Sequence, residues 1–144
     1  MRRPTLRRRR DPKLDRLAEV HLFAGCTDSD LKRIAALSVE VDIPAGRVLT
    51  KAGDPGHECF VVQEGTAVAA VPGREPIRVG PGEVIGELAL LERGPRTATV
   101  EAQSDMRLIV LDSREFASLM EDVPRVAQSV RAAVAERTRS PGAR

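Results

Sequence analysis

Apolar positions follow a helical spacing at both ends of the chain and a strand-like spacing in its middle. Between residues 11 and 38, apolar side chains recur at the three- and four-residue intervals that place them on one helix face. A break at Ala24-Gly25-Cys26 divides this region, and Thr27 or Asp28 can cap the part that follows. The pattern therefore predicts two short helices before residue 39.

From Val39 to Ile43 apolar and acidic residues alternate, which is typical of a half-buried strand. Short Val-rich runs then alternate with turns, most clearly at residues 59–62 and 67–71, and a further strand pair is expected over residues 97–101 and 107–111. This spacing predicts a compact β-roll or barrel. The turns are Gly53-Asp54-Pro55-Gly56, Glu64-Gly65, Pro72-Gly73 and Gly80-Pro81-Gly82.

Helical spacing returns after residue 112. Ser113 can cap a helix that buries Phe116, Leu119 and Met120, and Pro124 suits the first turn of another. Because the helices are segregated from the strands, we expect an α+β domain. It should occupy residues 13–138, with a basic disordered tail over 1–12 and a second tail over 139–144.

The composition suits one soluble globular domain. The chain has 144 residues, of which 42% are hydrophobic and 31% charged, so wholesale disorder is not expected. No apolar run is long enough to cross a bilayer, and no apolar stretch follows the basic N-terminus as in a secretory signal. A cytoplasmic location is therefore expected.

A net charge of +2 conceals a cluster of six arginines in the first ten residues. Such a cluster can bind nucleic acid or a membrane surface through its charge. Without interleaved aromatic residues it also fits a solvated tail, and both interpretations stay open. The six are Arg2, Arg3, Arg7, Arg8, Arg9 and Arg10.

Enzymatic chemistry has little support in the sequence. No Ser, Cys or His stands in a nucleophile motif, and His21 and His57 lack a metal-ligand spacing. Cys26 and Cys59 fit two reduced thiols, with Cys59 inside an apolar strand. No helix-turn-helix follows the last helix, so sequence-specific DNA binding is not expected. We expect a protein without catalytic activity, metal or resident cofactor.

The segment at residues 86–100 carries the distinctive chemistry. Gly86 at a junction between strand and helix exposes backbone amides that suit a phosphate-sized anion. The Arg96 guanidinium offers forked donors that match phosphate oxygens, and the Glu87 carboxylate can accept from a sugar hydroxyl. From the residues alone, a ribose phosphate site and a structural Glu87–Arg96 ion pair are equally supported.

Gly86-Glu87-Leu88-Ala89-Leu90-Leu91, followed by Pro95-Arg96-Thr97-Ala98-Thr99-Val100, resembles the phosphate-binding cassette of the cyclic nucleotide-binding domain family. The resemblance extends from about Leu17 through the helix after Pro124. It implies an eight-stranded antiparallel β-roll (a double-stranded β-helix, jelly-roll-like). N-terminal helices, a short cassette helix and two C-terminal helices would surround the roll.

In that family the glutamate at the place of Glu87 receives the ribose 2′-hydroxyl, and the arginine at the place of Arg96 pairs with the cyclic phosphate. The resemblance implies that backbone amides near Leu88, Ala89 and Thr97 complete the phosphate cradle. The expected ligand-binding residues are Gly86, Glu87, Leu88, Ala89, Arg96, Thr97, Ala98 and Arg131.

Two positions leave alternatives open. The hydroxyl of Thr97 can donate to the phosphate or to a guanine edge, so cAMP is the first expected ligand and cGMP the alternative. In this family the last helix is the lid over the base, where Arg131 either stacks on the purine or faces solvent. Its valine stripe, at Val126, Val130 and Val134, fits a core or a dimer seam.

We therefore expect a cyclic nucleotide sensor whose C-terminal helix closes over the ligand and signals to a protein partner or a second copy. The chain could also be the excised regulatory domain of a longer channel, kinase or transcription factor. The alternative is a ligand-regulated electrostatic binder of nucleic acid or membrane surfaces through the arginine cluster.

Overall fold

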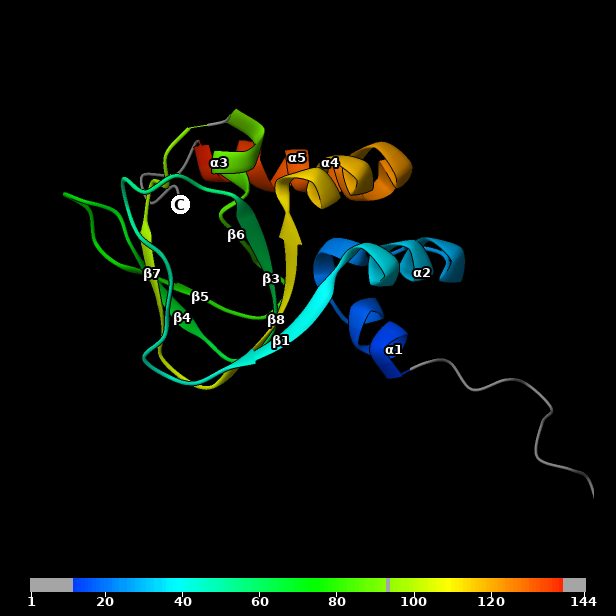
Figure 1. Cartoon of the computed structure of the whole chain (residues 1–144), viewed down its shortest axis with the longest axis horizontal. Helices are drawn as coiled ribbons and strands as arrows, with labels where there is room; N and C mark the ends of the chain where they lie inside the picture. Colours follow the sequence, from blue (N-terminus) through cyan, green and yellow to red (C-terminus); the bar gives the residue numbers. More distant parts are fainter. Residues whose placement is uncertain (1–11, 93, 139–144) are drawn as a thin grey trace, which may run out of the picture.

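Two four-stranded antiparallel sheets form a β-roll, with the N-terminal and C-terminal helices packed against it (Figure 1). The computed structural model describes residues 12–92 and 94–138. The predicted tails, including the arginine cluster, lie outside these residues apart from Pro12. The predicted α+β class and eight-stranded antiparallel roll are confirmed.

Each sheet is assembled from strands that are distant in sequence. One sheet has the order β1 (Val39–Ile43), β8 (Met106–Asp112), β3 (Glu58–Glu64) and β6 (Val84–Ile85). The other has the order β2 (Val48–Thr50), β7 (Thr99–Ala102), β4 (Ala67–Ala70) and β5 (Ile77–Val79). Among the described residues, the pairings between these strands are all antiparallel.

The expected pairing of residues 97–101 with 107–111 is wrong, although strands form at both places. β7 pairs with β2 and β4, whereas β8 pairs with β1 and β3. The amides of Gln103 and Ser104 both donate to the Thr66 carbonyl, at 2.9 and 3.3 Å, instead of closing a hairpin. The chain therefore crosses from one sheet to the other at this turn.

The N-terminal region contains α1 (Pro12–Ala18), a 3-10 turn (His21–Phe23) and α2 (Asp28–Leu37). Thr27 caps α2 as predicted, because its side chain accepts from the Asp30 amide while Asp30 accepts from the Thr27 amide. The two predicted helices are therefore present, with the 3-10 turn between them.

The C-terminal region contains α4 (Ser113–Asp122) and α5 (Pro124–Thr138). The predicted cap of α4 at Ser113 is wrong by one residue, since Asp112 forms the capping box with Glu115. The Asp112 carboxylate, at the end of β8, accepts a hydrogen bond from the Glu115 amide, so the helix begins one residue earlier than predicted. The last helix begins at Pro124, as predicted.

Two hydrophobic cores lie on opposite faces of one sheet. Along β3, Cys59 and Val61 belong to the core under the helices, whereas Phe60 and Val62 belong to the core inside the roll. This alternation follows from the two-residue repeat of a strand. The sheet is therefore a shared wall between the helices and the roll interior.

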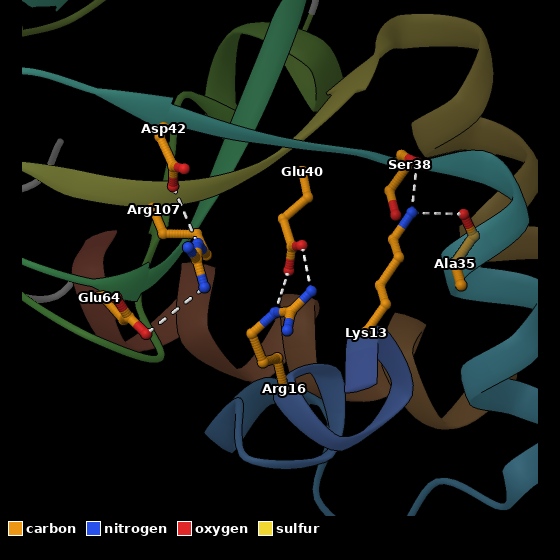
Figure 2. A network of polar contacts seen from close by, with 8 residues as sticks. All are labelled: Lys13, Arg16, Ala35, Ser38, Glu40, Asp42, Glu64 and Arg107. Atoms are coloured by element: carbon orange, nitrogen blue, oxygen red, sulfur yellow. Dashed lines mark hydrogen bonds and ion pairs between the residues drawn. The ribbon is translucent and has the colours of Figure 1, made fainter. Parts of the chain in front are cut away.

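Polar contacts tie α1 to the start of β1 (Figure 2). The Nζ of Lys13 donates to the carbonyl oxygens of Ala35 and Ser38, at 3.0 and 3.1 Å, and so satisfies the end of α2. The Nε of Arg16 donates to Glu40 Oε2 at 2.7 Å, and this pairing lowers the pKa of the Glu40 carboxyl.

Within the described residues, none of the helices combines the length and apolar character needed to cross a bilayer.

Candidate functional site

A short helix interrupts the roll where the sequence predicts it. Strand β6 ends at Ile85, Gly86 adopts a φ of +88°, and α3 (Glu87–Glu92) begins immediately afterwards. This positive φ is strained for residues with a side chain but open to glycine. Gly86 therefore lets the chain leave the strand and start the helix within one residue.

Arg96 follows α3 in the chain, and its side chain reaches back to Gly86. Its Nη1 donates to the Gly86 carbonyl oxygen at 3.2 Å, and only 9% of the residue is exposed. Burial lowers the pKa of the Arg96 guanidinium, against smaller opposing effects of Cys59 and Glu58. The group still carries its charge at neutral pH, so the site holds a largely desolvated cation.

Glu87 is a deeply buried carboxylate, with 1% of the residue exposed. Among the described residues, no ion pair joins it to Arg96. The alternative of a structural Glu87–Arg96 pair therefore has no support from this geometry. Both residues lie at the same junction between strand and helix.

A small cavity of about 10 Å³ lies between this segment and the inner strands. It brings together five of the predicted site residues, namely Gly86, Ala89, Arg96, Thr97 and Ala98. Three strand residues that sequence reasoning missed complete its lining, namely Thr50, Ile85 and Val100. Their strands converge only in the folded roll, so nothing in their spacing marks them.

A larger groove of about 1110 Å³ lies outside the roll, between α3, the β2–β3 loop and the two C-terminal helices. Arg131 is exposed and lines this groove rather than the small cavity, while Ala89 lines both. The structure therefore places Arg131 with Ala89 in the groove and apart from Gly86, Arg96, Thr97 and Ala98. The backbone of Leu88 lies in α3, but its side chain is outside the described atoms.

Gly56, in the β2–β3 loop, is a further residue of the site that sequence reasoning treated only as part of a turn. A Cβ atom at this position would lie 2.5 Å from Cβ of Ala89 and 3.0 Å from Nε of Arg96. Gly56 is 33 residues from Ala89 and 40 residues from Arg96 in sequence, so local sequence patterns indicate only that it belongs to a glycine-containing turn.

Two further expectations concern chemistry away from the cassette. Among the described residues, no group of three His, Cys, Asp or Glu side chains is placed to hold a metal ion. Cys59 is fully buried, and its burial raises the pKa of the thiol to about 12. Val126 and Val130 are buried in the core under the helices, which favours the core interpretation of the valine stripe; the Val134 side chain lies outside the described atoms.

Comparison with known proteins gives one family match, to the model of the cyclic nucleotide-binding domain over residues 40–123. A cyclic nucleotide-gated potassium channel of Mesorhizobium japonicum is 36% identical over 121 residues, which are 84% of this chain and 34% of the channel. The chain spans about a third of the length of the channel relatives it matches.

Two solved structures share both fold and sequence similarity. The regulatory domain of Toxoplasma gondii PKA with cAMP has a TM-score of 0.70 and 28% identity, covering 84% of this chain and 48% of its own. The catabolite activator protein of Thermus thermophilus has a TM-score of 0.72 and 28% identity, covering 82% and 58%.

Proposed function

This chain belongs to the cyclic nucleotide-binding domain family, and from that membership we propose that it is a non-catalytic sensor of cyclic nucleotides. The cassette at residues 86–100 would hold the ligand inside the roll. The C-terminal helices would carry the signal to a partner.

The observation that carries this proposal is the position of Arg96. It is a nearly buried cation at the wall of a cavity, and its described side-chain contact is with a carbonyl oxygen rather than a carboxylate. Desolvating an uncompensated charge is costly, so an anion at this point would be bound strongly. A cyclic phosphate supplies such an anion.

The buried carboxylate of Glu87 favours a ligand with a sugar beside that phosphate. A buried carboxylate can accept two hydrogen bonds from hydroxyl groups, and its 1% exposure shields them from water. The arrangement of one anion site and one hydroxyl acceptor at the same junction favours a ribose phosphate over inorganic phosphate. The similarity to a regulatory domain solved with cAMP supports the same assignment.

We place cAMP first and cGMP second. Thr97 lines the small cavity but remains exposed, so its hydroxyl can reach a ligand without losing all contact with water. A hydroxyl here could donate to the phosphate of either nucleotide or to the guanine of cGMP. Hydrogen bonding at this residue, rather than pocket size, would set the preference.

Closure of the C-terminal helix is the proposed output step. The cavity of about 10 Å³ is far smaller than the roughly 300 Å³ or more of small-molecule pockets, so the ligand must open it. The groove of about 1110 Å³ gives α3 and the C-terminal helices room to rearrange. Arg131 on its wall could then approach the base, and ligand binding would shift the population toward a closed form.

The partner would bind the solvent-facing side of α5. Val126 and Val130 point into the core, whereas Gln128 and Arg131 are exposed. A protein partner or a second copy of the chain could contact this face. The relatives include a channel and a regulatory domain of a kinase, in which the homologous segment is part of a longer chain.

Calorimetric titration of the purified protein with cAMP, cGMP and 5′-AMP tests the central proposal. We expect one site per chain for a cyclic nucleotide and much weaker binding of 5′-AMP, whose additional charge and open ring do not match a single arginine. Absence of heat with both cyclic nucleotides would refute the sensor function.

The arginine cluster supports a second proposal, since six guanidinium groups in ten residues would attract polyanions. Deleting residues 1–10 should abolish salt-dependent binding to DNA or anionic vesicles while leaving nucleotide titrations unchanged. Unchanged polyanion binding after the deletion would rule this proposal out.

A further inference from the structure

The loop between β2 and β3 lies against the Arg96 side chain, as Gly86 does. A Cβ atom at residue 56 would lie 3.0 Å from Nε and 3.1 Å from Cδ of Arg96. We propose that Gly56 is a positioning residue, whose missing side chain lets this loop hold the Arg96 guanidinium where the nucleotide phosphate binds. The proposal rests on the nucleotide-binding function proposed above.

The loop first fixes the backbone of Arg96. The Arg96 amide donates to the Asp54 carbonyl at 2.8 Å, and the Gly53 amide donates to the Arg96 carbonyl at 2.9 Å. A β-bridge between Pro55 and Pro95 continues this pairing. Arg96 is therefore attached to the β2–β3 loop by both of its backbone polar groups.

The side chain of Arg96 is also close to two glycines. Its Nε and Cδ lie beside Gly56, while its Nη1 donates to the Gly86 carbonyl oxygen and occupies the space that a Cβ of Gly86 would need. The guanidinium is thus confined by backbone from two segments. Such confinement fixes the direction of its forked donors before an anion arrives.

Space, and not backbone conformation, explains the glycine at residue 56. Gly53 and Gly86 both have φ near +90°, where other residues are strained, but Gly56 lies outside that region. Alanine is therefore conformationally allowed at this position. Its methyl group would, however, lie 2.5 Å from Cβ of Ala89, which is too close unless the loop, α3 or Arg96 moves.

The first test is Gly56→Ala, measured by nucleotide titration. We expect affinity for cAMP to fall about tenfold or more, the scale of one hydrogen bond to a charged group. In a background that carries both Arg96→Ala and Ala89→Gly, the same substitution should have little further effect, because neither the guanidinium nor the 2.5 Å contact with Cβ of Ala89 remains. Fully additive losses would show a general structural role and overturn the proposal.

A rescue variant separates displacement from unfolding. Adding Ala89→Gly to Gly56→Ala removes the 2.5 Å contact and should recover part of the lost affinity. Gly80→Ala is the matched control, since Gly80 lies in a distant turn with open space around it. Its affinity should stay within about twofold of the parent protein.

A readout without nucleotide keeps the inference separate from the proposed function. The Nε–H resonance of Arg96, assigned by its loss in Arg96→Lys, should shift in Gly56→Ala and stay unchanged in Gly80→Ala. If the parent protein binds no cyclic nucleotide but this resonance shifts, the positioning role stands and the sensor function fails. An unshifted resonance would overturn the positioning role whatever the titrations show.

Discussion

The Nη1 of Arg96 donates to the carbonyl oxygen of Gly86 at 3.2 Å, so the cation of the cassette is held by backbone rather than by an acid. A carbonyl carries only a partial charge and leaves most of the guanidinium charge uncompensated. An incoming phosphate can therefore add its hydrogen bonds without first displacing a carboxylate from Arg96.

Arg96→Ala should weaken binding of the cyclic nucleotide by about 1.5 to 3 kcal/mol, or roughly 10- to 150-fold, since charge-assisted hydrogen bonds disappear. Arg96→Lys should fall between, because lysine keeps the charge but not the fork. Titration gives the affinities, and thermal unfolding checks stability. Unchanged affinity, or a loss explained by unfolding, would make Arg96 structural.

Glu87→Ala should remove the acceptor for the ribose 2′-hydroxyl and cost about 1.5 to 3 kcal/mol of cAMP affinity. The specific prediction is coupling to the ligand. The parent protein should discriminate against 2′-deoxy-cAMP, whereas the variant should bind both ligands alike. If the variant keeps the full discrimination, Glu87 does not contact the sugar hydroxyl.

Thr97→Ala should weaken cGMP more than cAMP. The lost bond is neutral and partly solvated, so the difference should be about 0.5 to 1.5 kcal/mol. Parallel competition titrations with the two nucleotides measure it, and Thr97→Ser, which keeps the hydroxyl, is the control. Equal losses for the two nucleotides would remove Thr97 from base selection.

Ionisation of the buried Cys59 thiol should lower the free energy of unfolding in alkaline solution. Burial raises the pKa of its thiol from 9.0 to about 12, so the unfolded chain ionises first. Its contribution to stability is therefore intact below pH 9 and is lost between pH 9 and 12. Urea unfolding at pH 8 and pH 10 should show a smaller decline for Cys59→Ala than for the parent, and equal declines would contradict the prediction.

The Arg16–Glu40 pair should contribute to stability near neutral pH. Hydrogen bonding from Arg16 lowers the pKa of Glu40, so the contribution is present above the ordinary carboxyl pKa and is lost as pH falls through the lowered value. The coupling should be about 0.5 to 1 kcal/mol, because both side chains are partly exposed.

A double-mutant cycle of Arg16→Ala and Glu40→Ala, followed by urea unfolding, measures this coupling. It should shrink in 1 M salt and at low pH, as expected for a screened ion pair on the protein surface. A coupling that is insensitive to both would mean that the two side chains interact through packing.

Local signals in the sequence predicted much of this molecule. The cap at Thr27, the helix start at Pro124, the strand over Val39–Ile43 and the glycine before Glu87 all depend on a few neighbouring residues. The expected alternation of burial along that strand is incomplete, since Val39 is exposed. Such features can be predicted because they depend on residues that are close together in the sequence. The cassette was recognised for the same reason, as one continuous segment.

Contacts between distant segments were not predicted. Thr50, Ile85 and Val100 line the small cavity from three strands, and their residue types alone do not distinguish them from other buried strand residues. Sheet pairing across the turn at residues 103–105 was likewise decided by hydrogen bonds to Thr66. Propensity cannot encode either relationship, since both depend on the register of the complete roll.

Strands β3 and β8 separate the packing of the helices from the packing of the roll interior. Along β8, Leu108 faces the roll interior while Ile109 and Leu111 face the helices. Neighbouring residues on one strand are thus constrained separately, one by packing inside the roll and the others by packing against the helices. Side chains under the helices could therefore change without altering those that line the roll interior.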